Sequence, residues 1–443
     1  MAPKARSSWP TVSTGCAIAC VSPTASKRAT STIVTSSRLA VPPSVSPAPP
    51  SALPPDHVTS IASRFPGLAN GWARFDGPAG TQMVDVAIRA MSDWAASGHN
   101  ANTGGSFAAA QECDALLSRT RDVVGQLLNA DPNGICLGAN MTTMTFAFTR
   151  AVARTLTPND RVVGTMLDHD ANVSPWRVAC ETSGAEHVLA PFDVDTGILD
   201  PARVIELITP NTKWVAITGA SNLIGTAPHL APIITAAHAV GARVFVDAVH
   251  LAVHRPIDVA ALGCDVLATS PYKWYGPHSG VLCIQPDLLN SLPVAKVRPA
   301  ENIGPRRFET GTPNFEGIAA VEAAARFLIE EDMHKVMAAE NDVFAPLLDG
   351  LLSIDGVRVW GRQSMEGRVP TVAFTLRGHH PDAVAEELAR NKIAVWSGHS
   401  YAVEAVRHMG LSDSGGVVRA GVTRYVSHDD VTRLLDVVRS LAR

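Results

Sequence analysis

Hydrophobic residues recur with two different spacings from about residue 57 onward. In stretches such as "VDVAIRAMSDWAAS" and "AAAQECDALLSRTRDVVGQLLN" they return every three or four positions, which predicts amphipathic helices. Between such stretches stand short runs dense in Val, Ile and Ala, namely "RVVGTML", "KWVAIT", "ARVFVDAV" and "CDVLATS". Short apolar runs of this kind are typical of strands buried on both faces of a sheet. The alternation of the two patterns therefore predicts βαβ units and a mostly parallel sheet.

The pattern changes after about residue 315. A long helical stretch, "GIAAVEAAARFLIEEDMHKVMAAENDVFAPLLDGLLS", is followed by alternating strands in "VRVWG", "RVPTVAFTLRG" and "KIAVWSG". We therefore predict an α/β protein with a large domain at 76–315 and a smaller C-terminal α+β domain at 316–443. A short N-terminal segment, 56–75, is expected to pack near the smaller domain.

Residues 1–55 differ in composition from the rest of the chain. They are rich in Ser, Thr, Ala and Pro, and the first acidic residue is Asp56. Such a segment cannot bury enough apolar area to offset the entropy lost on ordering, so we predict a disordered extension. Arg, Lys and Ser without acidic residues also suit a transit peptide that directs the chain to an organelle, and a mis-assigned start is a third interpretation. None of these interpretations places chemistry in the segment.

Composition and charge narrow the classes of function. Of the 443 residues, 46% are hydrophobic and 18% are charged, which is typical of a globular enzyme. The formal net charge of −4 argues against a nucleic-acid partner, because such a protein needs a basic face. No apolar run approaches the roughly 18 residues needed to cross a membrane, so no membrane partner is expected.

The cysteines and the absence of common ligand-binding motifs exclude further classes of function. The seven cysteines are scattered, and no spacing resembles a zinc site, so we expect no metal, no disulfide framework and a cytoplasmic protein. The chain lacks H-E-x-x-H, the P-loop pattern and G-x-G-x-x-G. A metalloprotease, a P-loop NTPase and a standard dinucleotide-binding fold therefore all lack their main signal.

Two charged residues stand where strand-like runs end. Asp247 closes "ARVFVD", and Lys273 follows "CDVLATS" in "SPYKWYG". Ligands of open parallel sheets bind beyond the carboxyl ends of strands, and consecutive strands are often neighbours, so these side chains are expected to face one cleft. Alone, Asp247 fits a helix cap equally well, and a lone lysine is more often a surface residue. Together they suit pyridoxal phosphate, because a lysine amine forms a Schiff base with its aldehyde and an acid can hold its ring nitrogen protonated.

The stretch "LGANMTTMTFAF" offers a place for the cofactor's phosphate. Asn140, Met141, Thr142 and Thr143 stand at the expected start of an apolar helix. Helix N-termini bind phosphate through free N–H groups and through the helix dipole. Helix capping alone would explain one of these residues, but four polar or flexible positions favour a ligand. Ser270 is expected to add a hydroxyl from the other side.

Taken together, these residues resemble the class V aminotransferase group of pyridoxal-phosphate enzymes, and in particular its cysteine desulfurase-like branch. The resemblance runs from about residue 60 to the C-terminus. Each motif is short, but all follow one another in the family's order. They are "DGPAGTQ", "GANMTTM", "LDHDANVSPW", "GASNLIGT", "VDAVH", "SPYKWYGPHSG", "RFETGTPN" and "VRAGVTRYVS".

The resemblance implies a fold-type I pyridoxal-phosphate protein whose Schiff-base residue is Lys273. His169, in "LDHDANVSPW", matches the histidine that stacks on the cofactor's pyridine ring. Asn222, in "GASNLIGT", matches the side chain that hydrogen-bonds the ring hydroxyl. Asp247 matches the partner of the ring nitrogen, and His250 matches the residue near the ring hydroxyl.

The same resemblance implies how phosphate, substrate and a second subunit are bound. Ser270 and Tyr272 flank the lysine where the family binds the phosphate. Thr312, in "RFETGTPN", matches a threonine that reaches the phosphate of the neighbouring subunit, which implies a homodimer with shared active sites. Arg419, in "VVRAGV", matches the arginine that binds the substrate carboxylate with a geometry suited to two hydrogen bonds.

The resemblance breaks at the residue that would carry sulfur. Desulfurases have a cysteine in a pattern that reads roughly Arg-Thr-Gly-His-His-Cys, whereas this chain reads "VWSGHSYAVEA". Tyr401 stands at the cysteine position, and Trp396 stands where a second carboxylate-binding arginine is common. We therefore expect an enzyme that acts on an amino acid or a related amine through Schiff-base and quinonoid intermediates, without a persulfide cysteine. Lys273 is the expected proton shuttle and His169 a second acid or base.

Other interpretations stay open. A desulfurase or selenocysteine lyase that uses another thiol and an epimerase similar to isopenicillin N epimerase fit the same motifs. A regulator that binds pyridoxal phosphate without turnover is an alternative from a different class of protein.

Overall fold

The computed structural model describes residues 61–443. The extension expected at 1–55, together with Cys16 and Cys20, lies outside the described residues. Within the described residues, no helix is both long enough and apolar enough to cross a bilayer.

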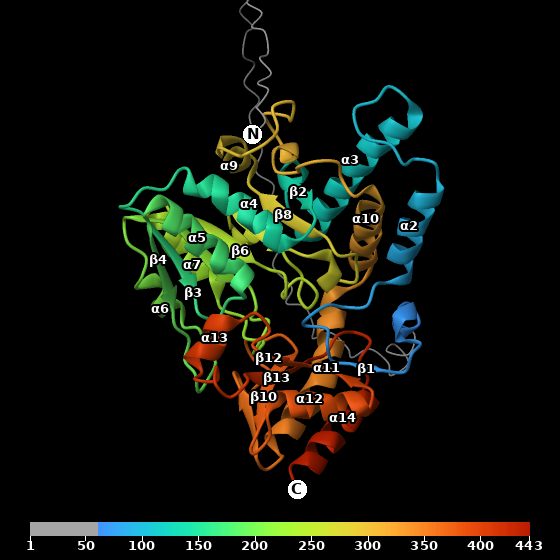
Figure 1. Cartoon of the computed structure of the whole chain (residues 1–443), viewed down its shortest axis with the longest axis vertical. Helices are drawn as coiled ribbons and strands as arrows, with labels where there is room; N and C mark the ends of the chain where they lie inside the picture. Colours follow the sequence, from blue (N-terminus) through green and yellow to red (C-terminus); the bar gives the residue numbers. More distant parts are fainter. Residues whose placement is uncertain (1–60) are drawn as a thin grey trace, which may run out of the picture. The chain divides into compact units, whose positions relative to one another are not determined.

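A seven-stranded sheet forms the centre of the first part of the chain (Figure 1). Its strand order is β2-β8-β7-β6-β5-β3-β4; β8 runs antiparallel to both of its neighbours, and the other strands run parallel. The expected mostly parallel sheet is therefore confirmed. The strands are β2 (Ile135–Gly138), β3 (Arg161–Thr165), β4 (Glu186–Ala190), β5 (Thr212–Thr218), β6 (Arg243–Asp247), β7 (Val266–Thr269) and β8 (Gly280–Ile284).

Helices cover both faces of this sheet, which explains why its strands read as continuous apolar runs. Val244 and Val246 of β6 pack into one core with helices α3, α7 and α10. Phe245, between them, packs on the opposite face against Phe148 of α4 and Trp176 of α5, with ring centroids 5.6 Å away in each case. The helices are α2 (Asp85–Ala96), α3 (Ala108–Leu128), α4 (Met141–Ala153), α5 (Ser174–Ser183), α6 (Pro201–Ile205), α7 (Leu230–Ala239), α8 (Val259–Leu262), α9 (Pro286–Ser291) and α10 (Phe315–Glu330).

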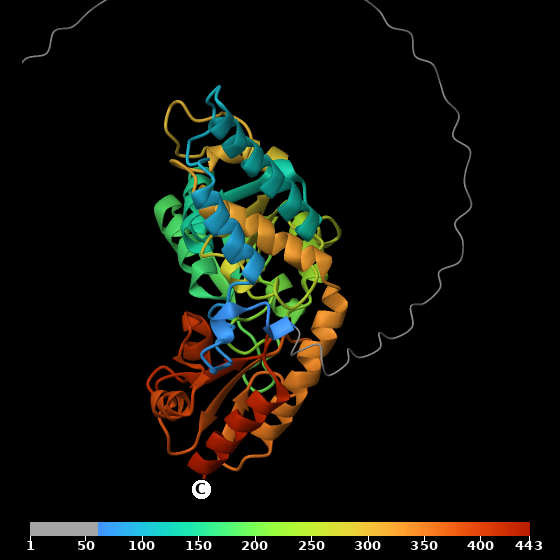
Figure 2. The same cartoon turned by 90° about the vertical axis from the view of Figure 1, so that its right-hand side faces the viewer.

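A four-stranded antiparallel sheet occupies the C-terminal part, in the order β12-β13-β10-β9. Its strands are β9 (Val357–Trp360), β10 (Thr371–Leu376), β12 (Trp396–Gly398) and β13 (Val417–Gly421). The helices of this part are α11 (Met333–Leu352), α12 (Pro381–Arg390), α13 (Val403–His408) and α14 (His428–Leu441). α11 follows α10 and packs against α14 and β9 (Figure 2). All strands of the seven-stranded sheet come before those of the four-stranded sheet in the sequence. We therefore propose 76–315 and 316–443 as the two domains.

The run "KIAVWSG" forms two strands rather than one. Ile393 and Ala394 form β11, which pairs in parallel with β1 (Ala73–Arg74) of the N-terminal segment. After Val395 the chain leaves this ladder, and Trp396 begins β12 beside β13. The change of partner places Trp396 at the edge of the four-stranded sheet.

Candidate active site

The carboxyl ends of five parallel strands meet at one edge of the large sheet, and the loops that follow them line one cavity. This edge is where ligands bind in open parallel sheets. The cavity is lined by Asn140, Met141 and Thr142 after β2, His169 after β3, Asn222 after β5, Asp247 and His250 at the end of β6, and Ser270, Tyr272 and Lys273 after β7. The structure thus brings together the residues expected to bind the cofactor, except Thr143 and Thr312, which line a different cavity. Four further lining residues carried no sequence signal, namely Ala171, Thr218, Ala220 and Val249.

Lys273 is held at the bottom of this cavity by a tight turn. β7 ends at Thr269, a 3-10 turn spans Pro271–Lys273, and Tyr275 then adopts a left-handed backbone with φ of 71°. The indole of Trp274 donates to Thr269 Oγ1 at 3.1 Å, which fixes the turn. Lys273 is buried and its Nζ donates to the carbonyl of Pro78. The amine of Lys273 therefore has a fixed position, whereas the amine of a surface lysine is mobile.

The electrostatics of the site favour a neutral Lys273. Burial and then the charge of Arg419 lower the pKa of its amine to about 7, although Asp247 partly opposes both effects. A free lysine side chain titrates near pH 10.4. Near neutral pH a large share of Lys273 is thus in the nucleophilic form.

Asp247 lies on the neighbouring strand, at the same edge of the sheet. Its Oδ1 accepts from the N–H of Val249 at 2.9 Å, and burial raises the pKa of the carboxyl to about 6. The helix that follows, α8, is capped by Asp258, which accepts from the N–H of Ala261. Asp247 therefore does not cap this helix. A cationic ligand group beside the Asp247 carboxyl would favour its ionised form.

His169 presents a neutral ring to the cavity. Its Nδ1 accepts from the N–H of Ala171 at 3.0 Å. Burial and then the charges of Lys273 and Arg419 lower the pKa of the imidazole to about 3. On its outer side the ring stacks on Tyr401, with centroids 5.5 Å apart and an interplanar angle of 27°. The sequence did not predict this contact.

Two residues that line the cavity each have a buried polar atom with no hydrogen-bond partner within residues 61–443. These atoms are Oδ1 of Asn222 and Nδ1 of His250. The other side of each residue is engaged, because Asn222 Nδ2 donates to the carbonyl of Ser400 at 2.8 Å and His250 Nε2 lies 2.9 Å from Thr371 Oγ1. A buried unpaired polar atom costs about 1–3 kcal/mol. Both atoms therefore fit a ligand with a polar ring substituent, such as the hydroxyl of pyridoxal phosphate.

The start of α4 fits a phosphate through its backbone. The side chain of Asn140 caps the helix, accepting from the N–H of Thr143 at 2.8 Å, so the first N–H groups of α4 are left for a ligand. A Cβ atom at position 280 of β8 would lie 2.3 Å from the carbonyl carbon of Asn140 and 2.5 Å from the nitrogen of Met141. Gly280 is therefore the residue that lets this helix end approach the sheet, and its place in "HSG" was not recognised from the sequence.

A larger cavity of about 730 Å³ opens from the first one, with which it shares Lys273, His169 and four other residues. Arg419 lines it, is only 4% exposed, and donates through Nη1 to the carbonyl of Asn222 at 2.8 Å. Burial lowers the pKa of its guanidinium to about 10, so it stays cationic at neutral pH. It is thus available to bind a carboxylate. Phe146, Trp396 and Tyr401 add aromatic walls.

Thr312 lies apart from Lys273. It is exposed, accepts from Asn102 Nδ2 at 3.4 Å, and lines another cavity of about 280 Å³. That cavity also includes Thr143, so it borders the first turn of α4. Within one chain, therefore, Thr312 does not reach the cavity that holds Lys273.

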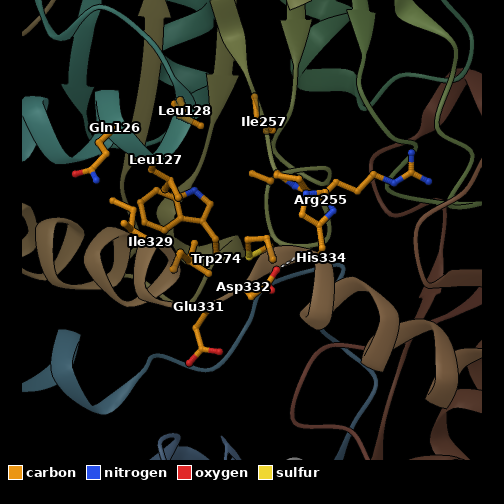
Figure 3. A pocket seen from close by; sticks show the side chains of 14 residues that line it. Gln126, Leu127, Leu128, Arg255, Ile257, Trp274, Ile329, Glu331, Asp332 and His334 are labelled. Atoms are coloured by element: carbon orange, nitrogen blue, oxygen red, sulfur yellow. Dashed lines mark hydrogen bonds between the residues drawn. The ribbon is translucent and has the colours of Figure 1, made fainter. Parts of the chain in front are cut away.

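A separate cavity of about 360 Å³ is lined by Trp274 and residues of several other elements (Figure 3). Two of its charged residues already have structural roles, since Asp332 caps α11 and Arg255 donates to the carbonyl of Arg368 at 2.7 Å. It contains none of the expected site residues. In the part of the chain that the structure describes, no three His, Cys, Asp or Glu side chains cluster as metal ligands would.

Comparison with known proteins gives a family and several relatives. The family model for class-V aminotransferases matches residues 74–434. An uncharacterized protein of Mycobacterium tuberculosis is 30% identical over 400 residues, covering 87% of this chain and 99% of that protein. A cysteine desulfurase of Enterobacter sp. is 30% identical over 403 residues, covering 85% of this chain and 96% of that protein. The crystal structure of a cysteine desulfurase from Escherichia coli superposes with a TM-score of 0.79 at 27% identity, covering 86% of this chain and 98% of that chain.

Proposed function

The chain belongs to the class-V aminotransferase family, and we propose that it acts on an amino acid or a related amine without passing sulfur to a cysteine of its own. Its cofactor is pyridoxal phosphate, as for the cysteine desulfurase type of this family. One observation carries the proposal. Tyr401 lines the substrate cavity, and by the family resemblance it matches the cysteine that accepts sulfur in desulfurases.

The described cysteines support this proposal because their thiols are protected from reaction. All are buried, and none lines the two connected cavities that hold Lys273. Burial raises the pKa of the Cys180 and Cys283 thiols to about 12, and it also raises the pKa of Cys136 and Cys264. The thiolate is the form that attacks sulfur, so such thiols are poor acceptors. The described cysteines are Cys113, Cys136, Cys180, Cys264 and Cys283.

The residues of the first cavity fit pyridoxal phosphate. The unpaired atoms of Asn222 and His250 suit its ring hydroxyl, Asp247 suits its ring nitrogen, and the N–H groups at the start of α4 suit its phosphate. Ser270 lines the same cavity and has a hydroxyl available for the phosphate. When bound, the cofactor supplies an electron sink for the carbanion that forms when a substrate α-proton leaves.

Arg419 and Lys273 have separate roles, in substrate binding and in proton transfer. The buried guanidinium of Arg419 binds the substrate carboxylate and so sets the orientation of the substrate. Lys273, whose pKa is lowered to about 7, accepts a proton through Nζ in its neutral form and can return it to another position. The neutral ring of His169 lines both connected cavities.

A cysteine desulfurase that uses another thiol is the second candidate. It is favoured by the names of the relatives and of the matching crystal structure.

A homodimer with shared active sites is also part of our proposal, because Thr312 borders the first turn of α4 from the side away from Lys273. We propose that this enzyme works in the cytoplasm on a small amino-acid-like molecule.

Sulfur transfer separates the two candidates. We expect sulfide release from cysteine in the presence of a reductant to be at least about 100-fold slower than in a dedicated desulfurase, because no reactive thiolate reaches the substrate. Sulfide and alanine are measured in parallel, and the intact protein is weighed by mass spectrometry after exposure to cysteine. Release at a desulfurase-like rate, with one added sulfur on a cysteine of this chain, would establish the second candidate instead.

Cofactor capture should depend on pH in a way that reports the buried amine. With a Lys273 pKa of about 7, the rate at which cofactor-free protein takes up pyridoxal should rise up to about pH 7 and level off by about pH 8. An ordinary lysine would give a rate that keeps rising toward about pH 10. The rate is measured by absorbance, and pyridoxal is used because it lacks the titrating phosphate. A continued rise above about pH 8 would contradict the neutral amine.

A further inference from the structure

We infer that the substrate is an α-amino acid with an aromatic side chain, which lies between Trp396 and Tyr401 while its carboxylate is held by Arg419. This inference rests on the proposed function, because it concerns the substrate of the same cavity.

The four-stranded sheet places Trp396 directly beside Arg419. β12 and β13 are antiparallel, and Trp396 is the cross-strand partner of Arg419. Side chains of such partners project from the same face of a sheet, close enough to touch. On its other side Arg419 is paired with Ala373 of β10, which has no bulk to compete for the space. A substrate bound through Arg419 therefore has the Trp396 indole as a neighbour. This indole is 53% exposed although it is large and apolar.

Tyr401 is held in place by contacts with other residues of the site. It stacks on His169 and is 65% exposed, so its outer face is free. Its carbonyl accepts from the N–H of Asp170 at 2.7 Å, and its own N–H donates to Nδ1 of His399 at 2.9 Å. The carbonyl of Ser400 accepts from Asn222.

The backbone at this point is strained. Ser400 and Tyr401 both adopt left-handed conformations, with φ of 47° and 59°. Residues other than glycine rarely adopt this conformation, and two in a row persist only where surrounding contacts impose them. An exposed aromatic ring that is held at the cost of strain, beside the substrate site, indicates that its position serves binding.

The charged side chains that line the outer part of the cavity already have partners within the chain. The Ser174 hydroxyl lies 2.9 and 3.0 Å from the two carboxylate oxygens of Asp170, and Arg177 pairs with Glu181 at 2.6 Å. In the proposed function, Arg419 binds the substrate carboxylate and Lys273 transfers the proton. Phe146 and Val178 add apolar surface to the wall of the 730 Å³ cavity. A small side chain would leave most of this apolar space unfilled, whereas an aromatic ring would contact the tryptophan and tyrosine faces.

Binding of substrate-like acids without an amine tests this inference independently of turnover. We expect 3-phenylpropionate to bind the holoenzyme about 100-fold more tightly than propionate, measured by calorimetry. Trp396→Ala and Tyr401→Ala should each weaken phenylpropionate about tenfold and leave propionate unchanged. Tyr401→Phe should retain the affinity, because it keeps the ring. Phe107→Ala is the matched control, since Phe107 is 60% exposed but lies outside the cavity.

Kinetics give a second readout. In Trp396→Ala and Tyr401→Ala, KM for phenylalanine should rise about tenfold with kcat little changed, while KM for alanine stays constant. Equal affinity for the two acids, or an equal loss of both in the variants, would overturn the inference. Failure of the proposed function would show itself separately, as persulfide formation and rapid sulfide release.

Discussion

Replacing Lys273 with alanine is expected to lower turnover by at least about 1,000-fold and to abolish the covalent link to the cofactor. Lys273 is buried, its amine is held at the carbonyl of Pro78, and burial brings its pKa to about 7. The variant loses both the nucleophile and the proton shuttle. Turnover is measured with an amino-acid panel, and the link is measured by borohydride reduction followed by peptide mass spectrometry.

Lys213→Ala is the matched control for this experiment. Lys213 is half exposed and lies 3.7 Å from Asp160 in a surface ion pair, far less constrained than Lys273. It should keep both full activity and the reduced cofactor adduct on Lys273. If Lys273→Ala still yields a borohydride-trapped adduct, another amine forms the link and the assignment of this site is wrong.

Asp247→Asn should bind the cofactor but turn over about 100- to 1,000-fold more slowly. A carboxylate can hold the ring nitrogen protonated, and an amide of the same size cannot, so the carbanion loses much of its electron sink. The carboxyl of Asp247 is buried, with a pKa raised to about 6, and a cationic ring beside it would return it to the ionised form. The absorbance spectrum of the bound cofactor reports its protonation, and kcat reports the chemical step.

Asp258→Asn provides the comparison for Asp247→Asn. Asp258 caps α8 through the N–H of Ala261, and asparagine caps helices about as well as aspartate. This variant should therefore behave like the unaltered protein. Near-normal activity of Asp247→Asn would mean that the acidic partner of the ring lies elsewhere.

The meeting of Asp247 and Lys273 could be predicted from sequence because it follows from local rules. Buried parallel strands have a recognisable composition, and residues at their carboxyl ends share one edge of the sheet. β6 and β7 are adjacent and parallel, and both side chains line one cavity. The role of each residue toward the cofactor was suggested by the family resemblance and is tested by the variants above.

Strand pairing was harder to predict than strand positions. The run "KIAVWSG" was expected as one strand, but it divides between β11 beside β1 and β12 beside β13. An apolar run does not specify its neighbours, because pairing depends on segments far away in the chain. The antiparallel direction of β8 was likewise not recognisable from the composition of "GVLCI".

The sequence by itself determined the alternation of helix and strand, the mostly parallel sheet and the chemical types of residue at its carboxyl edge, because periodicity and residue identity are local properties. Only the tertiary structure decided that Tyr401 stacks on His169 and that Trp396 stands beside Arg419. It also decided which atoms of Asn222 remain unpaired, since this residue meets Ser400 and Arg419 across 178 and 197 positions of chain. Such contacts depend on how the C-terminal sheet packs against the ends of the large sheet, and no local pattern encodes that packing.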